Sequence, residues 1–291
     1  MLRGVLAAFA ATILYNLSVV IQKMKAQQAS TSGFRLIATL VTKPLWLFGV
    51  GLQTAGLAFH FFALTKAPVT VVQPVIAAGV VFVVIFAALL LGERPGRQEL
   101  TGMVTAMGGV TVLLATVGEP VGMQRVRAAE LSAAVVALAV LIAVLLAATA
   151  WRRLATASAA AACIGVAAGL AQGMSDAMNR LMGAWLSPGA GWVPTPGIGR
   201  AAVACLLAFG IVGLVVTQNA LRLYRANTVV PCMLTAQLLV PVSMAIALYG
   251  QALPSGTVSE VAWLAACILV VVGVVVLSTS AQVASKFAPP A

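Results

Sequence analysis

Charged side chains are scarce in this chain. Its 291 residues include 17 Lys and Arg and 6 Asp and Glu, so 8% of the positions are charged, whereas soluble globular domains carry about 25%. So few charges cannot cover a water-exposed surface of this size. Hydrophobic residues make up 62% and the mean hydropathy is +1.08. The composition therefore excludes a soluble enzyme, a disordered chain and a secreted disulfide scaffold, and it predicts a protein whose main solvent is lipid.

Residues with versatile chemistry are also few. The four cysteines stand far apart in apolar segments without CxxC spacing, which excludes a zinc site or a disulfide framework, and His60 is the single histidine. Neither a P-loop nor a dinucleotide fingerprint occurs. We therefore expect no enzyme, no cofactor and no ATP-driven step. The net charge of +11 comes from basic residues scattered between apolar blocks, which is typical of a membrane protein and not of nucleic-acid binding.

The apolar residues fall into blocks long enough to cross a bilayer, which needs roughly 20 residues per helix. The sequence predicts nine such helices, at 4–24, 45–65, 68–92, 99–117, 128–149, 158–184, 201–222, 227–250 and 259–280. Residues 33–44 are too short and too charged to span and predict an interfacial helix, with a tenth span there as the alternative. The expected fold is an all-α integral membrane protein.

Basic residues predict the orientation of these spans, because cytoplasmic loops are enriched in Lys and Arg. With nine spans, eleven basic residues fall on one side: Lys23, Lys25, Arg35, Lys43, Arg94, Arg97, Arg152, Arg153, Arg222, Arg225 and Lys286. Six fall on the other side: Arg3, Lys66, Arg125, Arg127, Arg180 and Arg200. We therefore expect a multi-pass protein of the plasma membrane with its N-terminus outside and its C-terminus in the cytoplasm.

An internal repeat divides the chain. ThrValVal at 70–72 recurs at 228–230, and at the same offset Gly92 meets Gly250. The predicted organisation is a four-helix repeat over 1–120, a linker helix within 121–156 and a second four-helix repeat over 157–291. An odd linker inverts the second repeat in the bilayer. Inverted repeats are typical of secondary transporters, whose substrate site lies near the midplane between the halves.

The segment from Trp46 to Leu114 carries a family resemblance. It contains PheAlaLeuThrLysAlaPro at 62–68, ThrValValGlnPro at 70–74 and LeuGlyGluArgPro at 91–95, followed by a glycine-rich span. These motifs resemble the drug/metabolite transporter (DMT) superfamily of EamA-like proteins. The nine-span count and the basic residues that close the first helix of each repeat, Lys23 and Arg180, look most like its NIPA branch. That resemblance implies magnesium transport, with Mg²⁺ as the transported ion.

One acidic residue lies inside a predicted span. Asp176 shares a helix face with Gln172 and Asn179, at i, i+4 and i+7 spacing. Polar groups in hydrocarbon are costly and usually face the bundle interior, where they mark function. We therefore interpret this face as a site for a cation, an amine or a proton, and Asp176 as the metal ligand if the cargo is a metal. The alternative is that Asp176 pairs with Arg180 one turn further on and serves packing.

Other polar side chains complete the predicted site. His60 and Gln53 share a face of the second span, and His60 either carries protons or forms a structural hydrogen bond. Gln73 precedes a proline in the third span, and Asn16 and Gln237 fall near mid-depth. Pro74, Pro231 and Pro241 each free a backbone carbonyl four residues back. A substrate or ion would satisfy such carbonyls, and nearby threonine hydroxyls are the alternative partner.

Together these features predict a secondary transporter that moves a small solute or cation by alternating access. The first alternative is a NIPA-like Mg²⁺ transporter. The second is a membrane partner or lipid-handling subunit that transports nothing. The expected partners are the lipid bilayer and a small-molecule or cation substrate. Because both halves of the repeat lie in one chain, the functional unit is either a monomer or a homodimer.

Overall fold

The computed structural model describes residues 2–67, 69–116, 126–150, 156–186, 194–248 and 256–279. Apart from short connections, these residues are helical, which confirms the predicted all-α class. The long helices are α1 (Leu2–Ala26), α3 (Pro44–Lys66), α6 (Arg97–Thr116), α7 (Ala128–Ala150), α8 (Ala157–Leu186), α9 (Pro196–Leu223), α10 (Ala226–Ala247) and α11 (Thr257–Ser278).

Eight helices in the described part of the chain are long and apolar enough to cross a membrane, and Val75–Leu91 adds a shorter apolar stretch. These correspond to the predicted spans. Residues 33–44 contain α2 (Gly33–Leu40), whose eight residues rise about 12 Å at 1.5 Å per residue. That length is too short for a tenth span. Leu36 and Leu40 of α2 are buried while Phe34 and Arg35 are exposed, so the helix is amphipathic.

The third predicted span is interrupted. Instead of one helix over 68–92 it consists of α4 (Val69–Ala78), α5 (Val80–Phe86) and a π-helical turn, η1 (Ala87–Leu91). The break lies at Gly79, where the Thr12 hydroxyl of α1 donates to the carbonyl of Ile76 across 3.2 Å. A Cβ at Gly79 would lie 2.5 Å from the same hydroxyl oxygen. The absent side chain therefore lets Thr12 reach the backbone at the break.

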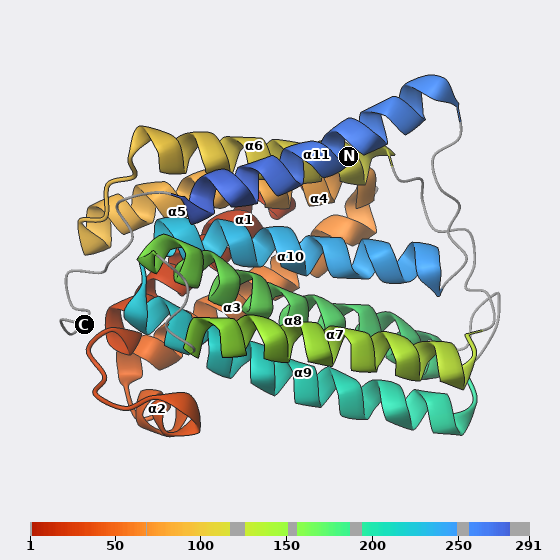
Figure 1. Cartoon of the computed structure of the whole chain (residues 1–291), viewed down its shortest axis with the longest axis horizontal. Coiled ribbons are helices and arrows are strands. Elements are labelled where there is room, and N and C mark those ends of the chain that lie inside the picture. Colours follow the sequence, from red (N-terminus) through yellow and green to blue (C-terminus); the bar gives the residue numbers. More distant parts are fainter. Residues whose placement is uncertain are drawn as a thin grey trace.

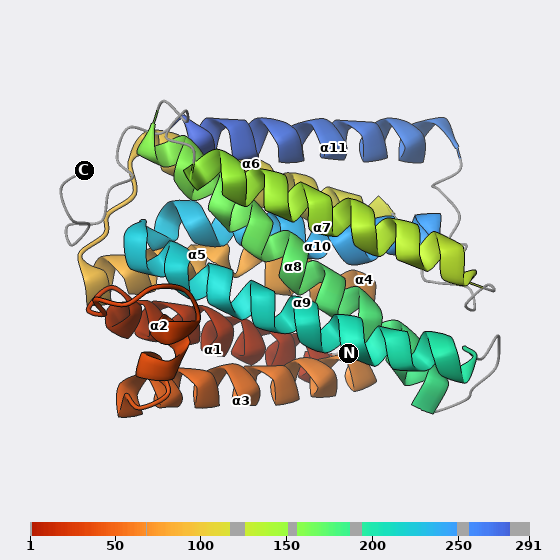
Figure 2. The same cartoon turned by 60° about the horizontal axis from the view of Figure 1, so that its bottom comes forward.

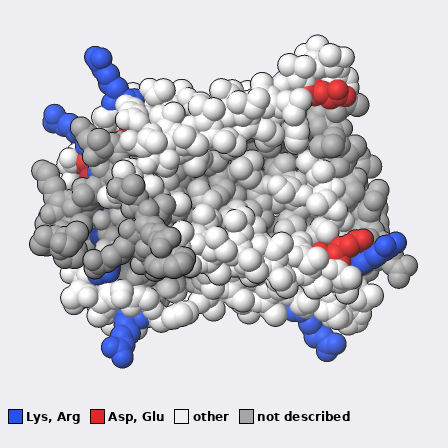
Figure 3. Space-filling view, viewed as in Figure 1, with Lys and Arg blue, Asp and Glu red and all other residues white. Residues whose placement is uncertain are grey.

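The helices run along the long axis of the molecule and alternate in direction (Figures 1 and 2). α1 begins at one end, and α11 finishes at the other. On the face shown in Figure 3 the charged side chains lie towards the two ends, and the surface between them is uncharged. Large apolar side chains are exposed along the helices, among them Val140 and Val144 on α7 and Val261 and Ile268 on α11. A broad apolar belt between charged ends fits a lipid environment.

Glycines let several helix pairs approach closely, as is common where lipid, not water, surrounds the helices. Gly165, Gly169 and Gly173 of α8 face the backbone of α10, where a Cβ at Gly169 would lie 2.1 Å from the Met233 carbonyl oxygen. Gly273 of α11 lies against Ala106 of α6 in the same way. The helix pairs that pack most extensively are α1 with α3, α8 with α9, α8 with α10, and α6 with α11.

Candidate functional site

Asp176 lies within α8, away from both ends of the helix, and accepts a hydrogen bond from a neighbouring helix. The Gln237 side chain of α10 donates to its carboxylate across 2.8 Å. Asp176 is nevertheless exposed, although it stands 19 residues into α8, about 28 Å from the start of that helix. Two of the predicted site residues, Asp176 and Gln237, are thus in direct contact. The side chain of Arg180, the alternative partner, lies outside the described residues.

Gln237 brings a second oxygen to the same place. Residue 241 of α10 is proline, which has no N–H to bond the Gln237 carbonyl in the usual helical way. This carbonyl faces α8 at Gly173, where a Cβ would lie 2.7 Å from its oxygen. The Asp176 carboxylate, the Gln237 amide and the free Gln237 carbonyl therefore gather where α8 and α10 meet.

Two aromatic side chains extend this site towards α1 and α3. The Tyr15 hydroxyl of α1 lies 3.4 Å from Nδ1 of His60 on α3, and the two rings meet edge to face. Tyr15 is also close enough to Asp176 for the two groups to interact electrostatically. His60 therefore reaches the Asp176 region through Tyr15, a residue that the sequence analysis did not select.

The remaining predicted residues on α8 and α1 have hydrogen-bond partners other than Asp176 or are exposed. Gln172 donates to the Thr217 hydroxyl of α9 across 2.7 Å, one turn before Asp176 on the same helix. Asn179 is exposed. Asn16 is buried and donates to the carbonyl of Thr12 within its own helix, at 2.6 Å. The side chain of Gln73 lies outside the described residues.

Gln53 belongs to a different polar group from Asp176. Gln22 donates to Gln53 across 3.0 Å and accepts from Gln218 at 2.6 Å. The Trp46 indole N–H donates to Gln218 at 3.3 Å. This chain of amides joins α1, α3 and α9 near the end of the bundle where α2 lies (Figure 2). We call this the basic end, because it carries Lys23, Lys25, Arg35, Lys43, Arg94, Arg97, Arg222 and Arg225.

The first of two buried ion pairs at the basic end joins Lys23 to Glu93. Their side chains are 0% and 11% exposed, and Nζ lies 3.2 Å from Oε1. Lys23 also donates to the carbonyls of Leu221, at 3.0 Å, and Tyr224. The other carboxylate oxygen of Glu93 accepts from the backbone N–H of Ala226 at 2.9 Å. The Glu93 carboxylate and the two carbonyl oxygens all carry full or partial negative charge, so they compensate the Lys23 ammonium.

The second pair joins Arg225 to Glu99 at 3.5 Å, with side chains 10% and 0% exposed. Glu99 also accepts from the backbone N–H of Gly96, at 3.0 Å, and from the Thr228 hydroxyl, at 3.4 Å. Arg225 also donates to the carbonyl of Arg94. We call Lys23, Glu93, Glu99 and Arg225 the charge network. Buried charges are costly unless paired and hydrogen-bonded, and these four satisfy both conditions.

Sequence reasoning missed the charge network. Basic residues near span ends usually set the orientation of a membrane protein, and Lys23 and Arg225 fit that interpretation. Glu93 and Glu99 lie at the ends of predicted spans, where carboxylates are usually exposed to water. A signal was available in LeuGlyGluArgPro at 91–95, which puts Glu93 directly after an apolar block. Nothing local distinguishes an exposed glutamate there from one that pairs with a lysine 70 positions earlier.

The prolines of α10 lie inside the helix, as predicted. The alternative that threonines satisfy the freed carbonyls is not favoured at Thr228, whose hydroxyl bonds Glu99. The Thr235 hydroxyl and the side-chain oxygen of Asn227 are buried without a hydrogen-bond partner.

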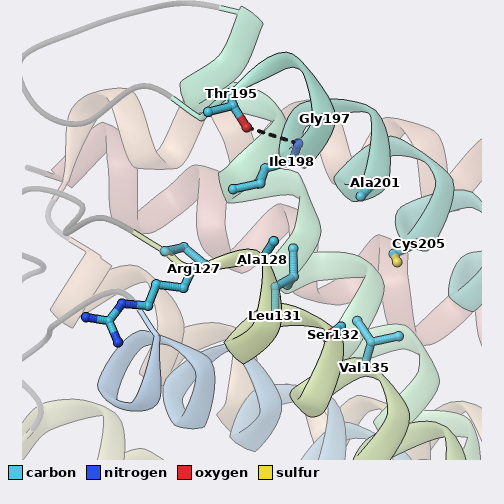
Figure 4. Close-up of a pocket in the computed structure, with 11 residues that line it drawn as sticks. Arg127, Ala128, Leu131, Ser132, Val135, Thr195, Gly197, Ile198, Ala201 and Cys205 are labelled. Atoms are coloured by element: carbon cyan, nitrogen blue, oxygen red, sulfur yellow. Dashed lines mark hydrogen bonds between the residues drawn. The ribbon is translucent and has the colours of Figure 1, made fainter.

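A separate open cleft of about 840 Å³ lies between the start of α7 and the start of α9 (Figure 4). Its wall is mostly apolar and includes Leu131, Val135 and Ile198, with Arg127 pointing away at the rim. The Thr195 hydroxyl there caps α9 by accepting from the N–H of Ile198. None of the predicted site residues lines this cleft. The described residues that line it include no carboxylate such as Asp176 that could bind a cation.

Comparison with known proteins identifies relatives of the first half of the chain. Residues 1–160 match the family described as Magnesium transporter NIPA. Over 122 residues the chain is 32% identical to Magnesium transporter NIPA4 of Mus musculus, a match that covers 38% of this chain and 28% of the mouse protein. The chain thus spans less than a third of that relative's length. No solved structure matches the chain.

Proposed function

Because this chain belongs to the magnesium transporter NIPA family, and is therefore a multi-pass membrane transporter, we propose that it carries Mg²⁺ and binds the ion at Asp176. The observation that carries this proposal is the hydrogen bond between Asp176 and Gln237. This hydrogen bond brings an exposed carboxylate beside amide and carbonyl oxygens, within a helix long and apolar enough to cross a membrane. Mg²⁺ prefers oxygen ligands of this kind.

The ion is bound with most of its water. Within the described residues, no group of three or more His, Cys, Asp or Glu side chains comes together. A single carboxylate is too few ligands for a dehydrated divalent ion, whereas Mg²⁺ usually keeps several waters and contacts one or two carboxylates. In the proposal, Asp176 supplies the negative charge, and the Gln237 carbonyl and the side chains of Gln172 and Asn179 accept hydrogen bonds from the bound waters. The ion is cargo, so the proposal needs no resident cofactor and no catalytic step.

Transport then proceeds by alternating access between the two halves. The packing supports this proposal, because α1 packs on α3 as α8 packs on α9, and α1 packs on α4 and α5 as α8 packs on α10. The electrostatic interaction between Asp176 on α8 and Tyr15 on α1 supports a site between the halves. In the plasma membrane, the basic end faces the cytoplasm and α1 begins outside, following the excess of Lys and Arg.

A second candidate cargo is an organic cation, as the wider DMT resemblance implies. The aromatic rings of Tyr15 and His60 meet edge to face, and Tyr15 interacts electrostatically with Asp176. A carboxylate next to aromatic rings suits an ammonium group, which is attracted to both. The two cargoes differ in one measurable respect. Mg²⁺ binding depends on the charge of Asp176 and on the oxygens around it, whereas an organic ammonium also depends on the ring at position 15.

The test is Mg²⁺ uptake into proteoliposomes that contain a Mg²⁺-sensitive dye. We expect saturable uptake by the parent protein and its loss in Asp176→Asn, which removes the charge with little change in shape. The control is Glu130→Gln, since Glu130 is an exposed carboxylate at the start of α7 that pairs with Arg127. Uptake by Asp176→Asn equal to that of the parent would overturn the assignment. Competition by organic cations alone would favour the second cargo, and folded protein that moves neither would favour a partner subunit.

A further inference from the structure

We propose that the charge network is an ionic latch: Lys23, Glu93, Glu99 and Arg225 hold the two halves together at the basic end, and their separation opens the Asp176 site towards that end. This inference rests on the proposed alternating-access mechanism. It concerns how the site is closed, and it does not depend on which solute the site binds.

The contacts of the network run between the two halves of the chain. Lys23 and Glu93 both belong to the first half. Each is also tied to the second half at the turn between α9 and α10: Lys23 to the carbonyls of Leu221 and Tyr224, and Glu93 to the N–H of Ala226. The side-chain amide of Asn227 adds a bond of 3.1 Å to the Glu93 carbonyl. The Lys23–Glu93 pair therefore connects the first half to this turn through hydrogen bonds.

The second ion pair crosses between the halves directly. Arg225 comes from the turn, and Glu99 comes from the first turn of α6. Thr228 on α10 donates to the same carboxylate. Moving the second half away from the first would leave Glu99 without both of these partners. It would also leave Lys23 without its two carbonyls.

Charge balance makes the network cooperative. It holds two positive and two negative side chains, so the closed state buries no net charge within it. Breaking one buried pair leaves a buried charge without a partner, and this costs far more free energy than separating a surface pair. Water must therefore reach the whole network before any part of it opens. The charge network therefore has two main states, one closed and one hydrated, and intermediate states are rarely populated.

The exposure of the two polar regions fits a bundle that is closed at one end. Lys23 and Glu99 are fully buried at the basic end, whereas Asp176, which lies nearer the opposite end of α8, is exposed. The amide chain of Gln22, Gln218 and Trp46 lies beside Lys23 and adds a second polar layer to the closed end. The described conformation thus isolates Asp176 from the basic end.

The experiment measures thiol labelling from the basic end. The reporter is Ala87→Cys in a protein whose four native cysteines are replaced by alanine. Ala87 is 0% exposed and belongs to the buried apolar cluster that includes Val20 of α1 and Val229 of α10. A charged, membrane-impermeant maleimide is applied to vesicles in which the basic end faces the medium. Sidedness is established by labelling an Arg35→Cys reporter on the exposed face of α2.

We expect slow labelling of the reporter in the parent and labelling about tenfold faster in Glu99→Gln and in Arg225→Gln, because labelling follows the population of the open state. The double variant with Glu99→Arg and Arg225→Glu restores an ion pair of opposite polarity and should return labelling to near the parent rate. Lys25→Gln is the matched control, since Lys25 lies on the same helix as Lys23 but donates to Gln28 outside the network.

A second reporter separates opening from loss of the fold. Native Cys232 is fully buried on α10 and packs against Gly165 of α8, within the second half. Kept as the single cysteine, it should stay protected in every variant. Faster labelling at position 87 with Cys232 still protected supports the latch. Unchanged labelling at position 87 in both single variants, or fast labelling in the charge-swapped double variant, would overturn it. Neither result requires Mg²⁺ flux, so the latch and the proposed cargo can fail independently.

Discussion

Gln237 of α10 donates a hydrogen bond of 2.8 Å to Asp176 of α8, and the carbonyl of the same glutamine is left without its helical partner by Pro241. One residue thus both orients Asp176, the only carboxylate of the described residues that lies away from the ends of a helix, and offers it a neighbouring oxygen.

Replacing Gln237 tests the orientation of Asp176. In Gln237→Leu the Asp176 carboxylate keeps its charge but loses its hydrogen-bond donor, the neighbouring amide of Gln237. We expect the KM for Mg²⁺ to rise several-fold while maximal uptake changes little, because ion binding is weakened and the conformational cycle is not. The measurement is concentration-dependent uptake in proteoliposomes. Gln98→Leu, at an exposed glutamine on α6, is the control. An unchanged KM would remove Gln237 from the site.

Replacing His60 distinguishes its two interpretations. His60 lies 3.4 Å from the Tyr15 hydroxyl on the neighbouring helix, an arrangement that suits a structural hydrogen bond between α1 and α3. We therefore expect His60→Gln to keep the parent dependence of uptake on external pH. The measurement is uptake between pH 5.5 and 8, chosen around the ordinary pKa of about 6.5 for histidine. A pH profile that flattens in the variant would show that His60 carries protons.

The close approach of α8 and α10 predicts a steric effect on stability. A Cβ at Gly169 would lie 2.1 Å from the Met233 carbonyl oxygen, so Gly169→Ala must push the helices apart. Overpacking of this kind costs about 1–3 kcal/mol. Gly108→Ala is the matched control, because a Cβ there has nothing within 4 Å. Thermal unfolding in detergent should show a lower midpoint for Gly169→Ala and not for Gly108→Ala.

The two lysines at the end of α1 predict very different effects. Lys23→Met leaves Glu93 without its ion-pair partner in a buried site, which should destabilise the protein by about 3–5 kcal/mol. Lys25→Met, two residues away, removes only a hydrogen bond to Gln28 outside the charge network and should change stability little. Combining Lys23→Met with Glu93→Gln should recover part of the loss. Equal unfolding midpoints for the two single variants would contradict the burial of the pair.

Orientation in the membrane predicts which ends are labelled from which side. Arg35 on α2 and Arg127 before α7 are exposed at opposite ends of the bundle. In intact cells that carry either Arg35→Cys or Arg127→Cys in a cysteine-free background, an impermeant thiol reagent should label position 127 and not position 35. The reverse pattern would place the N-terminus in the cytoplasm.

Local sequence features determined the membrane class, the approximate bounds of the helices, the basic end and the placement of Asp176 on one helix face with Gln172. They did so because span length, the 3.6-residue helical period and charge at span ends are properties of neighbouring residues. The repeat boundaries and the mode of transport remain predictions from the same patterns. The apolar length of the third span is also apparent from the sequence. Its break at Gly79 is not, because the break depends on Thr12 of α1, which bonds the Ile76 carbonyl.

Only the tertiary structure decided which polar groups meet. It separated Gln53 from Asp176 and brought Tyr15 of α1 against His60 of α3. It also joined Arg225 to Glu99 across 126 positions of sequence. A basic residue near the end of a span has the same local context whether it faces water or a buried carboxylate. Its partner is fixed by the packing of helices that are distant in the chain, and so the charge network became visible only once α1, α6, α9 and α10 were brought together.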